Sequence, residues 1–256
     1  MLLAIDVSNT HTKLGVFDRE TLVQHWRVQT LTERTADEYA ALLLGLFTAA
    51  DLAPSAVTGV IVSSVVPPIN QTVEDLCRKF FKAAPIWVGP GVKTGMPILY
   101  DVPQEVGADR IVNAVAAYAR YGGACIVVDF GTATTFDVVT ARGEYAGGVI
   151  VPGIAISAEA LFERAARLWR VEIRRPEQVI GKTTAASVQS GLYFGYLSLV
   201  DGVIARIEAE LGLRPRVIAT GGLAELFGGG SERIEEIDPL LTLTGLRLIH
   251  DRNRGG

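Results

Sequence analysis

Two short segments of the chain share an order of residues that could bind phosphate. In the first, Leu3–Phe17, an apolar run ends at Asp6, small hydroxyl and amide residues follow, and a second apolar run begins. In the second, Ile126–Val139, the same order recurs around Asp129. Small turn residues let backbone N–H groups approach anionic oxygens, and a carboxylate at a strand end can hold a hydrated cation. The two segments therefore predict a pair of strand–turn–strand units that clamp a nucleotide tail and its metal.

A gapless alignment of the two segments supports this interpretation. It superposes Asp6 on Asp129 and pairs small polar residues in the turns: Ser8 with Gly131, Asn9 with Thr132, and Thr12 with Thr135. Either segment alone is typical of an ordinary β-hairpin with a polar turn. The repetition of an acid at the same point favours the phosphate site.

The composition is that of a globular chain with a small negative charge. The 256 residues suffice for one large domain or two of ordinary size, and 49% of them are hydrophobic. The formal net charge of −4 gives no support for nucleic acid or an anionic membrane as partner. One basic segment is interleaved with acids, which favours a solvated face: Arg164, Arg167, Arg170, Arg174 and Arg175, with Glu163, Glu172 and Glu177.

Cysteine usage and hydropathy bear on the compartment. Cys77 and Cys125 are far apart and form no CxxC motif, so we expect reduced core cysteines. The chain opens directly with an apolar strand, so we expect no signal peptide. The longest uncharged stretch, Thr183–Val200, contains several hydroxyl and amide residues, so we expect no membrane span. Together these features predict a cytoplasmic protein.

Hydrophobic periodicity predicts two mixed α/β halves, with domains at residues 1–118 and 119–256. After each strand–turn–strand unit we expect further strands at Leu22–Val28, Val57–Val62, Pro85–Val88, Gly143–Val151 and Arg216–Ala219. We expect helices at Asp37–Ala49, from Pro67 onward, at Pro103–Tyr121, Ile154–Trp169, Thr183–Leu211, Leu223–Phe227 and Pro239–Ile249. The segment Gly89–Pro103 is a long loop rich in Gly and Pro, and loops of this length are often functional.

Six short motifs follow one another in the order seen in type III pantothenate kinases, within the actin/hexokinase/Hsp70 ATPase superfamily. They are Asp6–Thr10, Gly107–Arg110, Asp129–Thr135, Gly147-Gly148 with Pro152-Gly153, Lys182–Thr184 before Ser190-Gly191, and Thr220–Gly222. The chain resembles this family over nearly its whole length. The resemblance implies two similar ribonuclease-H-like (actin-like) ATPase domains, each a mixed sheet with flanking helices, around a nucleotide cleft.

The resemblance also implies an activity: ATP-dependent phosphorylation of pantothenate to 4'-phosphopantothenate, the first step of coenzyme A biosynthesis. Asp109 matches the family's general base; from spacing alone it would be a helix-surface acid paired with Arg110. Arg110 would either bind the substrate carboxylate or orient Asp109. The residues that match the family's pantothenate contacts are Tyr100, Gly107, Ala108, Asp109, Arg110 and Thr184.

The residues that match the ATP site are Asp6, Val7, Ser8, Asn9, Thr10, His11, Thr12, Lys13 and Thr132. Asp6 would hold Mg²⁺ through water, and Lys13 would place a point charge near the β- and γ-phosphates. The family usually has Gly where Ser8 stands and commonly Asn where His11 stands. Serine is tolerable at this position if its φ is not positive.

Asp129 resembles the family's ligand for a monovalent cation, potassium or ammonium. The family resemblance also implies a homodimer, joined through second-half helices that include Thr183–Leu211, a segment with more apolar surface than one helix face needs. A central core helix would explain that segment equally well. Two other functions stay open: a sugar-type kinase of the same superfamily, and a nucleotide-binding regulator that has lost catalysis.

Overall fold

The computed structural model describes residues 1–165, 168 and 170–254. The chain divides into two compact units. The first contains Met1–Met96, Tyr100–Ala116 and the segment from Leu241 onward, and the second contains Pro97–Leu99 and Ala117–Leu240. The C-terminal helix therefore belongs to the first unit, although it follows the second along the chain. The boundary between residues 118 and 119 stays a prediction.

The first unit is built on a mixed five-stranded sheet of order β3-β2-β1-β4-β5. Its strands are β1 (Leu2–Val7), β2 (His11–Asp18), β3 (Thr21–Gln29), β4 (Gly59–Ser64) and β5 (Pro85–Trp87). The first three form an antiparallel meander, while β4 runs parallel to β1 and β5 runs parallel to β4. The central strands β1 and β4 are almost entirely buried, as expected for strands covered on both faces.

The sheet of the second unit repeats this plan in the order β8-β7-β6-β9-β10. Its strands are β6 (Cys125–Phe130), β7 (Ala133–Val139), β8 (Tyr145–Pro152), β9 (Arg216–Gly221) and β10 (Glu236–Ile237). Again the first three form an antiparallel meander and the last two are parallel to the central strand. Two mixed sheets of the same order confirm the predicted pair of similar domains.

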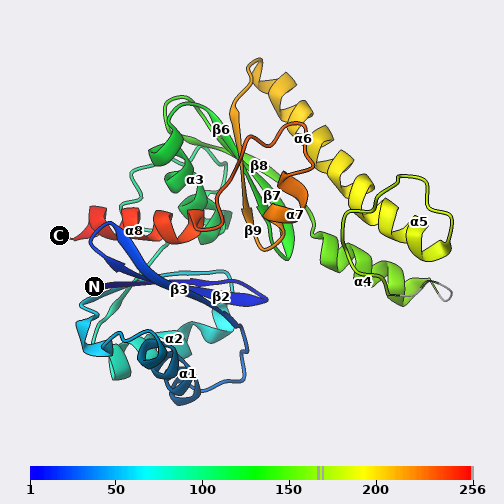
Figure 1. Ribbon diagram of the computed structural model, residues 1–256. Coiled ribbons are helices and arrows are strands. Elements are labelled where there is room, and N and C mark those ends of the chain that lie inside the picture. Colours follow the sequence, from blue (N-terminus) through cyan, green and yellow to red (C-terminus); the bar gives the residue numbers. More distant parts are fainter. Residues whose placement is uncertain (166–167, 169, 255–256) are drawn as a thin grey trace. The chain divides into compact units, whose positions relative to one another are not determined.

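Helices cover both faces of the first sheet (Figure 1). Its helical segments are α1 (Ala36–Ala49), η1 (Pro54–Ala56), η2 (Pro67–Ile69), α2 (Asn70–Leu76), the π-helical turn η3 (Cys77–Phe81) and α8 (Leu241–Asn253). Helices α1 and α2 pack on one face over Leu3, Ile5 and Val7. Helix α8 packs on the other face, where Leu243 lies close to Gly15. Because strand residues alternate between faces, Asp6 points to the α8 face.

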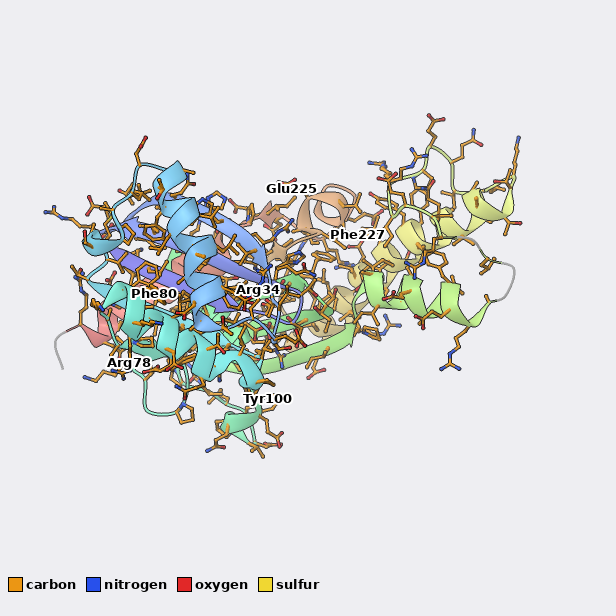
Figure 2. The ribbon with its side chains drawn as sticks, turned by 90° about the horizontal axis from the view of Figure 1, so that it is seen from below. Arg34, Arg78, Phe80, Tyr100, Glu225 and Phe227 are labelled. Carbon is orange, nitrogen blue, oxygen red and sulfur yellow. The ribbon has the colours of Figure 1, made fainter. Side chains whose placement is uncertain are left out.

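The second sheet also has an apolar face covered by helices. Its helical segments are α4 (Ile154–Arg164), α5 (Thr184–Ser190), the π-helical turn η5 (Gly191–Gly195), α6 (Tyr196–Leu211) and α7 (Ala224–Gly228). Residues of α4, η5, α6 and α7 form one core with Val128, Phe130 and Phe136 of the sheet. Figures 1 and 2 both show α4 and α5 at the same end of this unit.

Several predicted elements differ in detail from the structure. The helix predicted from Pro103 is interrupted: η4 (Pro103–Glu105) is followed by extended Val106, and α3 (Ala108–Tyr121) begins after it. The helix predicted from Ile154 ends at Arg164, and residues 166, 167 and 169, including Arg167, lie outside the described part of the chain. The two-residue strand β10 was not predicted, because a pair of residues carries no periodicity.

Both cysteines are buried and free, and burial raises the pKa of each thiol to about 12. Among the described residues, no helix has the length and hydropathy that a membrane crossing needs. In the basic segment, Arg170 and Arg174 pair with Glu159 and Glu172 on an exposed surface. Those ion pairs agree with a solvated charged face.

Candidate active site

A buried carboxylate ends β1 in the first unit. Asp6 is 1% exposed, and its two oxygens accept hydrogen bonds from Ser63 Oγ at 3.2 Å and Ser8 Oγ at 3.3 Å. Lys13 lies across the antiparallel ladder from Asp6, with its Nζ 3.9 Å from Asp6 Oδ2 and 3.5 Å from Thr242 Oγ1 of α8. The arrangement places one acid, one cation and three hydroxyl groups together at the end of a central strand.

The turn after Asp6 is held by a residue that the sequence did not point to. Thr30, which follows β3, donates from its backbone N–H to Thr10 O at 3.0 Å and from its hydroxyl to Ser8 O at 2.8 Å. Its Oγ1 also lies 2.9 Å from Thr12 Oγ1. Thr12 therefore points inward and stabilises the turn, whereas Asn9 and Thr10 are exposed at its tip. Thr30 reaches the turn only because β3 pairs with β2, so no local sequence motif predicts this role.

Ser8 occupies this turn without backbone strain. Among the residues that the structure describes, the non-glycine residues with positive φ are Arg19, Asp51 and Lys82, and Ser8 is not one of them. A Cβ atom is therefore accommodated at this position. Serine is therefore tolerated at this position, where the family usually has glycine, because its φ is not positive.

Positive charge gathers on the strands that leave this turn. Lys13 pairs in register with Arg27 of β3, and His11 pairs with Gln29 two residues away. Burial, followed by repulsion from Arg27 and Lys13, lowers the pKa of His11 below its usual value. The imidazole is therefore mostly neutral at pH 7, and the lasting cations here are Lys13 and Arg27. Such a surface suits an anionic ligand.

The motif Gly107–Arg110 opens α3 at the same edge of the sheet. Val65, which follows β4, donates its N–H to Val7 O at the end of β1. A Cβ built on Gly107 would lie 3.6 Å from Val65 Cγ1, so the start of α3 rests against that edge. The half-buried carboxylate of Asp109 accepts the Arg110 N–H at 2.8 Å. Ligands of open α/β sheets bind at the carboxyl ends of their strands, where this unit places Asp6 and Asp109.

Asp109 also explains the glycine of its motif. A Cβ on Gly107 would lie 2.7 Å from Asp109 Oδ1, so a side chain there would displace this carboxylate. The Gly107 carbonyl accepts the N–H groups of Arg110 and Ile111. Gly107 therefore lies directly before α3, and Ala108 is the first residue of the helix. Arg110 is 8% exposed. The acid is thus folded over the helix N-terminus, where the backbone dipole favours negative charge.

In the second unit, two glycine-containing segments lie against the turn Gly131-Thr132 that follows Asp129. Gly153 N donates to Thr132 O at 3.1 Å, and a Cβ on Gly153 would meet that oxygen at 2.2 Å. Gly221 has φ +95°, and a Cβ there would lie 2.4 Å from Asp129 Oδ1. Only glycine combines that torsion with that closeness. The structure therefore brings together Gly131-Thr132, Pro152-Gly153 and Gly221, which are far apart in sequence.

The structure corrects the gapless alignment of the two turns. In the first sheet Asp6 pairs with Lys13, whereas in the second Asp129 pairs with Thr135. The second turn is one residue shorter, so Thr135 corresponds to Lys13, and Thr12 corresponds to Thr134 rather than Thr135. The second unit thus has a hydroxyl where the first has an ammonium group. The two turns are similar in position and differ in charge.

Two further predicted contacts lie elsewhere. Tyr100 is half-buried on the segment between β5 and α3 (labelled in Figure 2). Thr184 is exposed as the first residue of α5, and Thr183 before it caps the helix by accepting the Ala186 N–H at 3.1 Å. The helix cap is therefore Thr183 and not Thr184. Thr184 has its side chain available to a ligand or another chain.

The donor set suits hard cations. Both carboxylate oxygens of Asp6 already accept hydrogen bonds, which fits a metal held through water better than one bound directly. Asp129 lies beside Gly221 and the Gly131 turn, where the neighbouring groups are carboxylate and carbonyl oxygens. In the part of the chain that the structure describes, no three His, Cys, Asp or Glu side chains gather into a metal cluster. A divalent ion would therefore depend on ATP phosphates for most of its ligands.

The chain is similar to known proteins over almost its whole length. The sequence model of the type III pantothenate kinase family matches residues 2–206. A type III pantothenate kinase from Anaeromyxobacter sp. (strain Fw109-5) is 60% identical over 254 residues, covering 99% of this chain and 100% of the relative. One from Myxococcus xanthus is 57% identical over 253 residues, covering 99% of each chain.

A solved structure agrees at the level of fold. The chain is similar to a ROK family glucokinase from Streptomyces griseus, with a TM-score of 0.54 and 14% identity, covering 100% of this chain and 99% of that one. At this identity the likeness concerns the fold alone, and it places both units in the actin-like ATPase fold of sugar kinases.

Proposed function

Because the chain belongs to the type III pantothenate kinase family, whose members phosphorylate pantothenate with ATP, we propose that Asp109 is the general base of this reaction here. The function is ATP-dependent phosphorylation of pantothenate in coenzyme A biosynthesis, and an ATP-dependent kinase uses a divalent metal. The observation that carries the proposal is the start of α3. It rests on the edge of the sheet that holds Asp6 and puts Asp109 there.

In this proposal Asp109 accepts the proton of the primary hydroxyl of pantothenate as its oxygen attacks the γ-phosphorus. A carboxylate is a common general base, and Asp109 presents one in the first turn of α3. Arg110, buried beside it, either forks onto the substrate carboxylate or orients Asp109. Tyr100, Gly107 and Ala108 complete the contacts from this unit.

The ATP phosphates would lie over the turn Ser8–Thr10, with contributions from Val7, His11, Thr12 and Thr132. Lys13 would neutralise β- and γ-oxygens, and Asp6 would orient Mg²⁺ through water. Catalysis of this kind comes from alignment and charge neutralisation, which the fixed turn and the buried acid favour. The two serine hydroxyl groups and the Lys13 ammonium group that gather around Asp6 support this assignment.

Asp129 is proposed as ligand of a monovalent cation, potassium or ammonium. A Cβ on Gly221 would lie 2.4 Å from Asp129 Oδ1 and one on Gly131 3.8 Å from it, so backbone comes close to this carboxylate, and carbonyl oxygens replace the hydration shell of potassium well. The ion would offset the negative charge of the ATP phosphates, which Thr132 would also contact.

The active form is proposed to be a cytoplasmic homodimer that completes the pantothenate site. The helix Thr183–Leu211 uses most of its apolar residues within its own unit, since Leu192, Tyr193 and Tyr196 are buried there. Support comes instead from apolar side chains that stay exposed on α4, before α5 and on α6: Ile156, Leu161, Val179, Ile180 and Leu199. Ile180 is 80% exposed, four residues before Thr184. A second copy covering this surface would place Thr184 at the interface.

The test is a panel of acceptors incubated with Mg²⁺-ATP in potassium buffer. We expect mass spectrometry to show 4'-phosphopantothenate from pantothenate and no phosphorylated product from glucose, mannose or N-acetylglucosamine. Phosphorylation of a sugar in preference to pantothenate would overturn the proposal. ATP binding without any phosphorylated acceptor would indicate the regulator.

A further inference from the structure

Tyr145 is a buried tyrosine that the proposed mechanism does not use. It begins β8, is fully buried, and donates from its hydroxyl to Asp137 Oδ1 at 2.7 Å. Asp137, also fully buried, accepts at its other oxygen from Thr135 Oγ1 at 3.0 Å. Thr135 is the register partner of Asp129. A line of hydrogen bonds and strand pairing therefore connects Tyr145 to the cation-site candidate.

A β-bulge aims this side chain. Along the β7–β8 ladder the register shifts between Val138 and Val139, so that Val139 faces Tyr145 and Ala146 is the extra residue. Without the shift, Tyr145 would point to the opposite face of the sheet from Asp137, because strand side chains alternate. Gly147 in the bulge has φ +116°, a torsion that favours glycine. The bulge thus turns the Tyr145 side chain toward Asp137.

The backbone of Tyr145 holds a segment from a distant part of the sequence. Its N–H donates to Pro97 O at 2.8 Å, and its carbonyl accepts the Leu99 N–H at 2.8 Å. Ile98 forms an isolated parallel bridge with it. Strand β8 is an edge strand, so Pro97–Leu99 adds a short extra strand beside it. The next residue along the chain is Tyr100.

We propose that Tyr145 is a positioning residue for the pantothenate loop. The hydroxyl of Tyr145 binds Asp137, and its backbone N–H and carbonyl bind Pro97 and Leu99. The pantothenate loop, here the segment Pro97–Pro103, is thereby attached to β8, and this attachment fixes the position of Tyr100. This inference rests on the proposed function, in which Tyr100 contacts pantothenate. Within Pro97–Leu99 no side chain is fully buried, and Leu99 is 53% exposed, so the backbone hydrogen bonds to Tyr145 are the main attachment of this segment.

The first test is Tyr145→Phe, which keeps the ring and the backbone bonds and removes the hydroxyl. We expect the KM for pantothenate to rise roughly threefold to tenfold, with the KM for ATP within about twofold of wild type. The matched control is Tyr193→Phe, another buried tyrosine, whose hydroxyl in η5 donates to Leu226 O of α7 at 3.4 Å. Equal rises in both KM values for Tyr145→Phe would indicate a structural role only and overturn the proposal.

The second test acts on the loop and leaves the sheet intact. Leu99→Pro removes the N–H that donates to Tyr145, whereas Leu99→Ala keeps it. We expect Leu99→Pro to raise the KM for pantothenate as Tyr145→Phe does, and Leu99→Ala to stay near wild type. Similar values for the proline and alanine variants would contradict the role of this hydrogen bond.

A third measurement does not depend on activity. Hydrogen exchange of the peptide that covers residues 97–103 should be faster in Tyr145→Phe than in wild type and unchanged in Tyr193→Phe. Unchanged exchange in Tyr145→Phe would overturn the proposal. If wild type fails to phosphorylate pantothenate, the proposed function fails, and the exchange result still decides whether Tyr145 fastens the loop.

Discussion

Lys13 lies opposite Asp6 across the β1–β2 ladder, with its Nζ 3.9 Å from the Asp6 carboxylate. The two side chains differ in exposure: Asp6 is 2% accessible and Lys13 is 21% accessible. The acid is thus fixed inside the sheet edge while the ammonium group still reaches solvent. A buried carboxylate needs a partner of this kind, and the partner can also turn toward an incoming anion.

Replacing Lys13 by alanine is expected to raise the KM for ATP roughly 10- to 150-fold, because a charge-assisted contact with phosphate contributes about 1.5–3 kcal/mol. The KM for pantothenate should change much less. Steady-state kinetics with each substrate varied in turn measures both values. The control is Lys79→Ala, which removes a lysine paired with Asp37 on an exposed helical surface. An unchanged KM for ATP in Lys13→Ala would contradict the phosphate role.

Ser8→Gly is expected to leave the KM for ATP within about twofold of wild type, because Ser8 does not need a positive φ. The change removes the hydroxyl that donates to Asp6 and frees the unfolded backbone. We therefore expect a loss of roughly 0.5–2 kcal/mol in the free energy of unfolding, measured by denaturant titration. A large gain in ATP affinity would instead show that serine impairs the turn.

Asp129→Ala is expected to abolish activation by potassium or ammonium and to weaken ATP binding. The carboxylate sits against Gly221 and beside the Gly131 turn, where a monovalent ion would offset phosphate charge. Turnover in potassium, ammonium and sodium buffers of equal ionic strength measures the effect. If wild type works equally well in sodium and potassium, the cation role of Asp129 is wrong.

Ile180→Asp is expected to dissociate the homodimer and to raise the KM for pantothenate before it affects stability. The side chain is 80% exposed within one chain, so a charge there costs nothing unless a second copy covers it. Sedimentation velocity at assay concentration measures whether the protein is a monomer or a dimer. Val23→Asp is the control, since Val23 is 44% exposed on β3 in the other unit. A fully active wild-type monomer would refute the dimer.

Much of the fold could be predicted because its elements carry strong periodic patterns. The buried runs of β1 and β6, each ending in an acid, indicated the duplication, and both sheets have the same strand order. The break before α3 could not be predicted, because Pro103 suits a helix start and extended Val106 carries no signal. The Gly107 carbonyl accepts the first N–H groups of that helix, and Val65 of the sheet edge lies beside Gly107.

The candidate site was predictable where residues lie next to one another in sequence. Lys13 and Asp6 belong to one hairpin, so their proximity follows from its turn. Ser63 and Thr30 reach this turn from β4 and from the end of β3, and only sheet register brings them there. The one-residue difference between the two turns was also invisible, since both align without a gap.

The central claim is that Asp109 removes the hydroxyl proton of pantothenate during phosphoryl transfer. Asp109→Asn keeps the size of the side chain and an oxygen that can accept the Arg110 N–H, so the start of α3 should persist. Asp75→Asn is the control, an acid on α2 whose carboxylate accepts a hydrogen bond from Gln71 at 2.9 Å.

The most direct measurement is the kcat for 4'-phosphopantothenate formation by wild type and Asp109→Asn at saturating Mg²⁺-ATP, pantothenate and potassium, with folding checked by circular dichroism. We predict a fall of roughly 100-fold or more in the folded variant, the usual scale of general-base catalysis, and no fall in Asp75→Asn. A folded Asp109→Asn enzyme with near-normal kcat would contradict the account.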